Sequence, residues 1–338
     1  MIRIGLAGYG YWGPNLARAV TGLPGARLEM IADMSPAALV RAGHAHPGAR
    51  LTPSIADMIA DPQVDAVMIA TPVSTHFDLS MAALRQGKHV LVEKPMAETA
   101  ERARLMIDEA ARRKLVLMVD HTFVYTGAVQ SIARLIEAGE IGALYYYDSV
   151  RVNLGLFQRD VNVIWDLAVH DFSIMERLIK ARPVAISASA AGFLRDRPES
   201  MAHLTVYYDD GAMAHLNVNW LAPVKIRQTL IGGSRKMIIY DDMQNSEKVK
   251  VYDRGADAPT DAYQQMISYR LGDMHAPALS TKEALVTEAE EFLRCIQTGA
   301  TPLTDGASGL RVVEILEAAS RSSDLRGFPV DLVTLKVA

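Results

Sequence analysis

The sequence predicts two domains: an α/β domain built on a doubly wound parallel sheet, followed by an α+β domain with a large, mostly antiparallel sheet. Three observations predict this arrangement. Short apolar runs alternate with helical patterns over residues 1–120, as in repeated βαβ units. A glycine-rich segment, Gly8–Gly13, follows the first run and opens a helix. After about Asp120, strand-like runs follow one another through short turns, which is typical of antiparallel pairing.

The strands of the first domain are predicted from continuous apolar runs, because the strands of a parallel sheet are covered on both faces. One helix runs from the glycine-rich turn to about Val20, and another begins at Ser35-Pro36, a favourable N-cap followed by proline in the first turn. Further helices are expected over 71–87 and 98–114. The expected strands are Ile2–Ala7, Arg27–Ala32, Ala66–Ala70, His89–Val92 and Leu115–Val119.

The second domain is predicted to hold consecutive strands, with helices over 128–138, 165–180, 282–298 and 307–322. Asp209-Asp210-Gly211 joins two of the runs and is a strong hairpin signal. The predicted bounds are therefore 1–120 and 121–338, and the last helix could return to the first domain. The expected strands are Ala143–Val152, Val184–Ala191, His203–Tyr208, Ala212–Trp220, Ile226–Ile231 and Lys236–Tyr240.

The composition is that of a globular protein, and it excludes several classes of partner. The chain has 338 residues, half of them hydrophobic and 22% charged, with a net charge of −4, so no nucleic-acid partner is expected. The single cysteine, Cys295, allows no intrachain disulfide and suits a reducing compartment. No apolar stretch is long enough to span a membrane. We therefore expect a cytoplasmic protein.

Gly8, Gly10 and Gly13 fit the pattern G-x-G-x-x-G, with Tyr11 and Trp12 between the last two glycines. The first glycine allows a tight turn, the second lets the backbone approach a pyrophosphate, and the third allows close packing of helix against strand. The helix N-terminus then offers free N–H groups to the phosphates. This context favours a dinucleotide-binding Rossmann domain, and the alternative is a glycine-rich turn without a ligand.

Asp33 ends the second predicted strand, where a carboxylate can accept hydrogen bonds from the adenosine ribose. It would repel a 2′-phosphate, and Met34 offers no cation beside it. The sequence therefore favours NAD over NADP as cofactor, although NADP use stays open because one residue carries the distinction. The alternative is a helix-capping or surface aspartate.

Thr71-Pro72 and Glu93-Lys94-Pro95 follow two parallel strands at their carboxyl ends, where the ligand crevice of such a sheet lies. We assign Thr71, Pro72, His76, Glu93 and Lys94 to the cofactor site. Lys94 could also reach a substrate hydroxyl; the alternative is an ordinary solvated lysine.

Three motifs together resemble the Gfo/Idh/MocA oxidoreductases: Gly8–Gly13, Glu93-Lys94-Pro95 and the segment Asp166–His170 (DLAVH). The resemblance covers nearly the whole chain, including Thr304-Asp305-Gly306. It implies an NAD-dependent sugar or polyol dehydrogenase, a cis Lys94–Pro95 bond, and a homodimer or homotetramer formed through the second sheet. The family also contains non-catalytic regulators that bind the dinucleotide.

Oxidation of a secondary alcohol requires loss of a proton as well as a hydride, and His170 is the predicted proton-transfer group. Asp166 lies four residues earlier on a predicted helix, so it could orient the imidazole. Lys94 would stabilise negative charge on the reacting oxygen. The resemblance gives the lysine and histidine similar roles. The alternatives are an exposed i,i+4 pair or a metal site, and no second histidine or cysteine stands at ligand spacing, so no metal is predicted.

The predicted substrate contacts are Lys94, Tyr125, Arg151, Asn153, Asn162 and His170. Arg151 could pair with a carboxylate or phosphate, or lie on an outward strand face. Two segments, GYWGPNL at Gly10–Leu16 and HTFVY at His121–Tyr125, look most like family members that act on nucleotide sugars. The sequence thus predicts hydride transfer between NAD and a sugar, with a nucleotide-linked substrate favoured. The alternatives are an inositol, polyol or free-aldose dehydrogenase, and a non-catalytic NAD(H)-binding regulator.

Overall fold

The computed structural model describes residues 1–155, 157, 161–257 and 268–332. The chain forms two compact units, Met1–Thr126 with Lys282–Glu314, and Gly127–Thr281 with Ile315–Ala338. These bounds differ from the predicted 1–120 and 121–338, because the chain returns to the first unit over 282–314. The reason is an apolar helix face: Leu285 and Phe292 are buried in one core with Leu16 of the first helix.

The first unit is built on a six-stranded parallel sheet in the order β3-β2-β1-β4-β5-β6. The strand order reverses between β1 and β4, and in such sheets the ligand crevice lies beside the carboxyl ends of the strands at this point. The five predicted strands are present. The sixth, β3, was missed because Arg50-Leu51-Thr52 is short and mostly exposed and gives no apolar run. The strands are β1 Ile2–Ala7, β2 Ala26–Ala32, β3 Arg50–Thr52, β4 Ala66–Ile69, β5 His89–Glu93 and β6 Leu117–Asp120.

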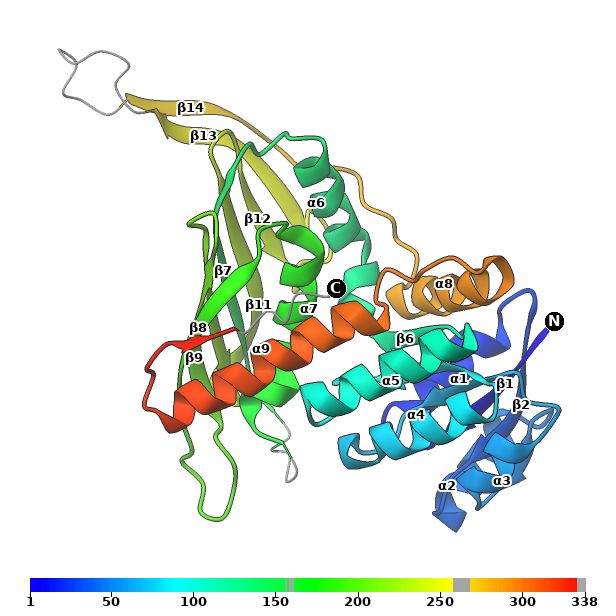
Figure 1. Ribbon diagram of the computed structural model, residues 1–338. Coiled ribbons are helices and arrows are strands. Elements are labelled where there is room, and N and C mark those ends of the chain that lie inside the picture. Colours follow the sequence, from blue (N-terminus) through cyan, green and yellow to red (C-terminus); the bar gives the residue numbers. More distant parts are fainter. Residues whose placement is uncertain (156, 158–160, 258–267, 333–338) are drawn as a thin grey trace. The chain divides into compact units, whose positions relative to one another are not determined.

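Helices cover both faces of this sheet. Ile4 and Leu6 of β1 share a core with α1, α2 and α8, whereas Gly5 between them faces Met58 of α3. On the α3 side, α4 and α5 lie against each other (Figure 1). Ser35 caps α2 as predicted, since its hydroxyl accepts from the Ala38 N–H. The helices are α1 Gly13–Thr21, α2 Pro36–Ala45, α3 Ile55–Ala60, α4 His76–Arg85, α5 Ala100–Arg113, α8 Ala284–Thr298, and the short 3₁₀ turns η1 Val73–Thr75 and η2 Thr122–Tyr125.

The free edge of β6 is closed by the segment before α9 (Gly306–Asp324). The Val119 N–H donates to the Thr304 carbonyl at 2.8 Å, and the Thr304 hydroxyl donates back to the Val119 carbonyl at 2.7 Å. Gly309 then packs so closely that a Cβ there would lie 2.6 Å from Val119 Cγ2. This contact is a second tie between the returning segment and the first unit, and it covers a strand edge that would otherwise be open.

The second unit contains a nine-stranded sheet in the order β14-β13-β12-β11-β7-β10-β9-β8-β15, in which only β7 and β10 pair in parallel. All six predicted strands and the Asp209–Gly211 hairpin are confirmed. The two-residue β15 was also missed, as were β13 and β14, which carry many polar or exposed residues. The strands are β7 Leu144–Leu154, β8 Pro183–Ala191, β9 Met201–Tyr208, β10 Met213–Asn219, β11 Leu221–Gly233, β12 Met237–Asp241, β13 Val249–Asp257, β14 Ser268–His275 and β15 Val330–Asp331.

The helices of the second unit include α6 (Gly127–Glu137) and α7 (Val169–Leu178), which pack against each other. A π-helical turn, η3 (Ile164–Ala168), leads into α7. The sequence predicted one uninterrupted helix over 165–180, because apolar periodicity does not distinguish a single π-helical turn from the α-helical turns that follow it. Within the described residues, no helix combines the length and apolar character that a membrane crossing requires.

Candidate active site

The glycine-rich loop has the geometry that a pyrophosphate requires. Gly8 has a φ of +93°, and a Cβ on it would lie 2.5 Å from the Ala70 carbonyl oxygen. A Cβ on Gly13 would lie 2.1 Å from the Gly8 carbonyl oxygen. A Cβ on Gly10 meets nothing within 4 Å, so this position is open to an approaching ligand. The loop therefore needs two glycines for its own folding and keeps the third open at the N-terminus of α1.

Asp33 is tied to this loop. Its Oδ2 accepts from the Tyr9 N–H at 2.6 Å, and its Oδ1 accepts from the Ser35 N–H at 2.8 Å. Because Ser35 caps α2, the alternative of a helix-capping aspartate does not hold. The two bonds fix the carboxylate at the end of β2 and leave further lone pairs for ribose hydroxyls.

Arg41 is a cation near this position that the sequence analysis missed. Its Nη2 donates to the Tyr9 carbonyl at 3.3 Å, so α2 brings a guanidinium back to the glycine-rich loop. The helical turn between Asp33 and Arg41 hides this proximity in the sequence. Asp33 and Arg41 both bond the backbone of Tyr9, one with a carboxylate that can bind ribose hydroxyls and the other with a guanidinium that can bind a phosphate.

Replacing Asp33 with serine should shift the preference from NAD toward NADP by roughly tenfold or more, the worth of a hydrogen bond to a charged group. The dissociation constants of both cofactors, measured by calorimetry at one ionic strength, test this. In the Asp33→Ser background, Arg41→Ala should reverse the gain for NADP and leave NAD little changed. An unchanged ratio in Asp33→Ser would show that this carboxylate does not discriminate the cofactors.

His76 joins two loops at the carboxyl edge of the sheet. Its ring lies between the Pro95 carbonyl, 2.9 Å from Nδ1, and the Thr71 carbonyl, 2.8 Å from Nε2. The side chain is buried, and burial lowers its pKa, so the neutral ring donates to one carbonyl at a time. His76 therefore holds the crevice loops together, and its contact with the cofactor stays a prediction. Thr71 and Pro72 remain at the loop surface, and the Thr71 hydroxyl bonds that of Thr75 at 2.6 Å.

Glu93 and Lys94 stand at the end of β5, and the Lys94–Pro95 bond is cis, as the resemblance implied. The Lys94 N–H donates to Glu93 Oε2 at 2.9 Å. Glu93 lies beside Asp120 of β6, and burial together with this neighbour raises its pKa well above the ordinary value. Glu93 and Lys94 are both partly exposed, and Lys94 carries the ammonium group, which can donate hydrogen bonds to a ligand.

Tyr125, a predicted substrate contact, lies in the interior of the first unit. It is buried in the core with Leu285 and Phe292, and its hydroxyl bonds the Thr304 hydroxyl at 3.1 Å. The cause is the packing of η2 beneath α8, which turns this aromatic side chain inward. Within HTFVY, at least Val124 and Tyr125 thus serve packing.

In the second unit, the π turn η3 carries Asp166, and His170 is the second residue of α7. Asp166 Oδ2 accepts from the Trp220 indole at 3.0 Å. Asn162 opens this segment: its Oδ1 accepts from the N–H groups of Ile164 and Trp165, each at 3.1 Å. Asp166 lies within the π turn and His170 just after it, and such turns occur frequently at functional sites.

Arg151 lies on neither an outward face nor a free surface. It is buried, and its Nε donates to Asp171 Oδ2 at 2.6 Å. Asp171 Oδ1 also accepts from the Ser149 hydroxyl at 2.7 Å. The guanidinium is thus held by an internal carboxylate, and the predicted contact with a substrate would require it to leave Asp171. Asn153, two residues further along β7, remains partly exposed.

The structure adds three residues that the site prediction left out: Asp120, Glu288 and His121. Asp120 ends β6 and accepts from the Trp12 indole at 2.8 Å, so the predicted cofactor residue Trp12 is anchored beneath the loop, whereas Tyr11 is exposed. Burial lowers the pKa of His121 to about 4, so it is neutral at physiological pH. A carboxylate directly after an apolar strand could have identified Asp120; nothing in the sequence marks Glu288.

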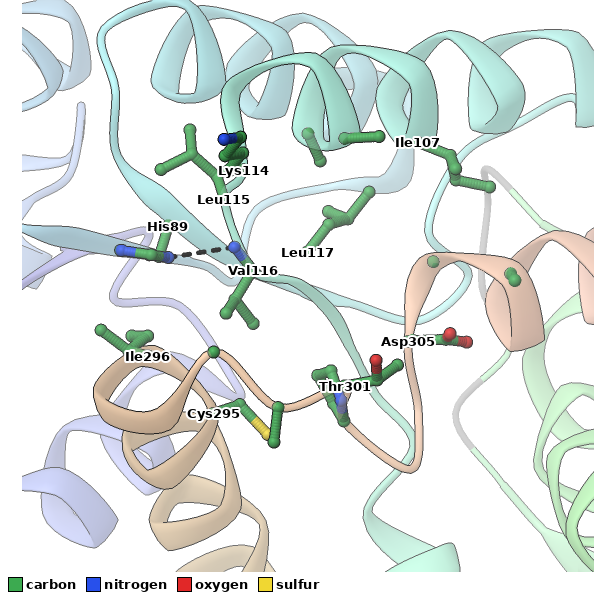
Figure 2. Close-up of a pocket in the computed structure, with 17 residues that line it drawn as sticks. His89, Ile107, Lys114, Leu115, Val116, Leu117, Cys295, Ile296, Thr301 and Asp305 are labelled. Carbon is green, nitrogen blue, oxygen red and sulfur yellow. Dashed lines mark hydrogen bonds between the residues drawn. The ribbon is translucent and has the colours of Figure 1, made fainter.

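A cavity of about 450 Å³ lies at the opposite edge of the first unit. Figure 2 shows it between Lys114–Leu117, Cys295 and Ile296 of α8, and the segment that contains Thr301 and Asp305. His89 opens β5, and its Nδ1 accepts from the Val116 N–H at 3.0 Å, so the cavity borders the amino ends of the strands. It is therefore separate from the cofactor crevice at the carboxyl ends.

Comparison with known proteins gives a match over most of the chain. Residues 2–121 match the family described as "Oxidoreductase family, NAD-binding Rossmann fold", and residues 129–239 match the "GFO/IDH/MocA C-terminal domain". UDP-N-acetylglucosamine 3-dehydrogenase of Acidithiobacillus ferrooxidans is 31% identical over 267 residues, which cover 78% of this chain and 80% of that protein.

Inositol 2-dehydrogenase of Rhizobium meliloti is 29% identical over 334 residues, covering 95% of this chain and 96% of that protein. The solved structure of the Acidithiobacillus ferrooxidans enzyme has a TM-score of 0.79 with 27% identity, covering 96% of this chain and 98% of that one. Similarity thus extends through both units and to relatives with different sugar and polyol substrates.

Proposed function

The chain belongs to the Gfo/Idh/MocA family of NAD-dependent sugar and polyol dehydrogenases, and from that premise we propose that its substrate is a nucleotide-linked sugar. The use of NAD is supported by the glycine-rich loop. There is no room for a side chain at Gly8 or Gly13, a ligand can approach at Gly10, and Asp33 is fixed beside the loop. When bound, the nicotinamide supplies the hydride acceptor for oxidation of a CH–OH group.

The chain's own residues accept the hydroxyl proton and stabilise the negative charge on the reacting oxygen. We assign proton transfer to His170, because a partly exposed imidazole can accept a hydroxyl proton near neutral pH. Lys94 donates a hydrogen bond to the reacting oxygen and stabilises the negative charge that develops there. The Asp166 carboxylate accepts a hydrogen bond from the Trp220 indole and would orient the imidazole of His170.

The nucleotide-linked substrate is supported by two features of the chain. Its GYWGPNL segment looks like those of nucleotide-sugar enzymes, and Tyr11 within that segment is 86% exposed and available to a ligand. The relative from Acidithiobacillus ferrooxidans acts on a UDP-linked amino sugar by its name. A second candidate is an inositol, favoured by the similarity to inositol 2-dehydrogenase over 95% of this chain.

A substrate panel tests the proposal. The purified protein is given NAD with UDP- and dTDP-linked sugars, inositols and free aldoses, and NADH formation is followed by absorbance. Turnover of a nucleotide sugar above the corresponding free sugar supports the proposal. Preference for an inositol would replace it with the second candidate. Tight NAD(H) binding without turnover of any compound would indicate a regulator.

A further inference from the structure

His121 is a buried histidine whose ring has no partner within the protein. Its side chain is 2% exposed, and neither ring nitrogen has a hydrogen-bond partner in the part of the chain that the structure describes. Most buried polar groups are hydrogen-bonded, because an unpartnered one lowers the stability of the fold. The buried ring of His76, by contrast, lies between two carbonyl oxygens. The unpartnered ring of His121 therefore points to a partner that is not part of the chain.

His121 lies at the edge of the sheet where a ligand binds. Glu93 and Asp120 are register partners at the ends of β5 and β6. Lys94 and His121 follow them directly and so leave the sheet at neighbouring positions. Ligands of such sheets bind beside these carboxyl ends. The oxygen assigned to Lys94 must lie against the nicotinamide during hydride transfer, so His121 stands at the nicotinamide end of the crevice.

The ring of His121 is neutral and suits a neutral polar group. Burial lowers its pKa to about 4, and the nearby charges of Asp120 and Lys94 act on it in opposite directions. At physiological pH, one ring nitrogen therefore donates a hydrogen bond and the other accepts one. A neutral ring also adds no repulsion toward the cationic nicotinamide of NAD.

The backbone around His121 is fixed before any ligand binds. The His121 N–H donates to the Val119 carbonyl at 2.8 Å, and the His121 carbonyl accepts from the Val124 N–H at 2.9 Å. The preceding residue, Asp120, accepts from the indole of Trp12 in the glycine-rich loop at 2.8 Å. The end of β6 is thus tied to the loop that faces the pyrophosphate, and little binding free energy is lost in ordering it.

We propose that His121 hydrogen-bonds the carboxamide of the nicotinamide and limits rotation of the ring about its glycosidic bond. The carboxamide is the only group of the nicotinamide that forms hydrogen bonds, and it offers both a donor and an acceptor, as the imidazole does. His121 thus acts on the cofactor, whereas Lys94 and His170 act on the substrate. The inference rests on the role proposed for Lys94, and it holds for a nucleotide sugar and for an inositol alike.

The test compares NAD with ADP-ribose, which lacks the nicotinamide, in calorimetric titrations of the wild type and of His121→Phe. Phenylalanine has a similar size and no polar atom. The variant should bind NAD about tenfold more weakly, the upper range for one neutral hydrogen bond, and should bind ADP-ribose as the wild type does. Without cofactor, its thermal unfolding midpoint should equal or exceed that of the wild type, because the substitution removes an unpartnered buried group.

The matched control is His89→Phe, since Nδ1 of His89 accepts from the Val116 N–H at 3.0 Å at the opposite edge of the sheet. This control should lower the unfolding midpoint and leave the binding of both ligands unchanged. A third variant, His121→Gln, keeps a donor and an acceptor and should bind NAD more tightly than His121→Phe. If His121→Phe does not fold, His121→Leu, which is also apolar and is smaller, takes its place.

NAD binding unchanged in His121→Phe would overturn the inference. Equal losses for NAD and ADP-ribose would overturn it as well, because they would show that the histidine supports the fold of the site rather than the nicotinamide. The titrations contain no substrate, so their outcome is independent of the substrate panel that tests the proposed function.

Discussion

Substituting His170 with alanine is expected to lower kcat by about 10²–10⁴-fold, the usual contribution of a general base. The loss should fall on kcat rather than on NAD affinity, because His170 belongs to α7 of the second unit and the glycine-rich loop belongs to the first. Steady-state kinetics with the substrate found in the panel, together with NAD calorimetry, measure the two effects separately.

The matched control is His203→Ala, which removes an exposed histidine from β9 of the same unit. It should leave kcat close to the wild-type value. If His170→Ala retains full activity while the control does the same, proton transfer must be assigned to another group, and Lys94 becomes the first candidate. A loss in both variants would indicate a general effect on the second unit.

The parts of the fold that the sequence predicted well are those fixed by local pattern. The run Ile2–Ala7 became β1 with the predicted bounds, and Ser35-Pro36 opened α2, because apolar continuity and capping act over a few residues. The glycine-rich loop could also be predicted from the sequence, because the backbone at Gly8 and Gly13 leaves no room for a side chain. The short strand β3 lacked such a pattern and was missed.

The parts of the site that sequence could not predict depend on which way a side chain turns. Side-chain alternation along β7 places Arg151 on one face of the strand, but nothing in the local sequence shows that Asp171 of α7 lies against that face. His76 and Tyr125 lie in the expected segments, yet tertiary packing occupies both with internal partners. Glu288 is far along the chain from Asp120, so only the return of α8 to the first unit reveals their contact.

Replacing Asp171 with alanine is expected to lower the free energy of unfolding by about 3–5 kcal/mol, as when one partner of a buried ion pair is removed. Arg151 would stay buried without its carboxylate, and the Ser149 hydroxyl would lose its acceptor at 2.7 Å. Urea unfolding at neutral pH measures the change. The control Glu137→Gln breaks the pair of Arg177 with a 44% exposed carboxylate and should cost at most about 1 kcal/mol.

The double variant Arg151→Met/Asp171→Leu separates a charge effect from a packing effect. It removes both buried charges together, so it should be more stable than Asp171→Ala. If Asp171→Ala costs less than about 1 kcal/mol, within the range of the exposed pair, Arg151 must be able to leave Asp171 at little expense. Its guanidinium could then pair with an anionic substrate group, which would support the prediction that Arg151 contacts the substrate.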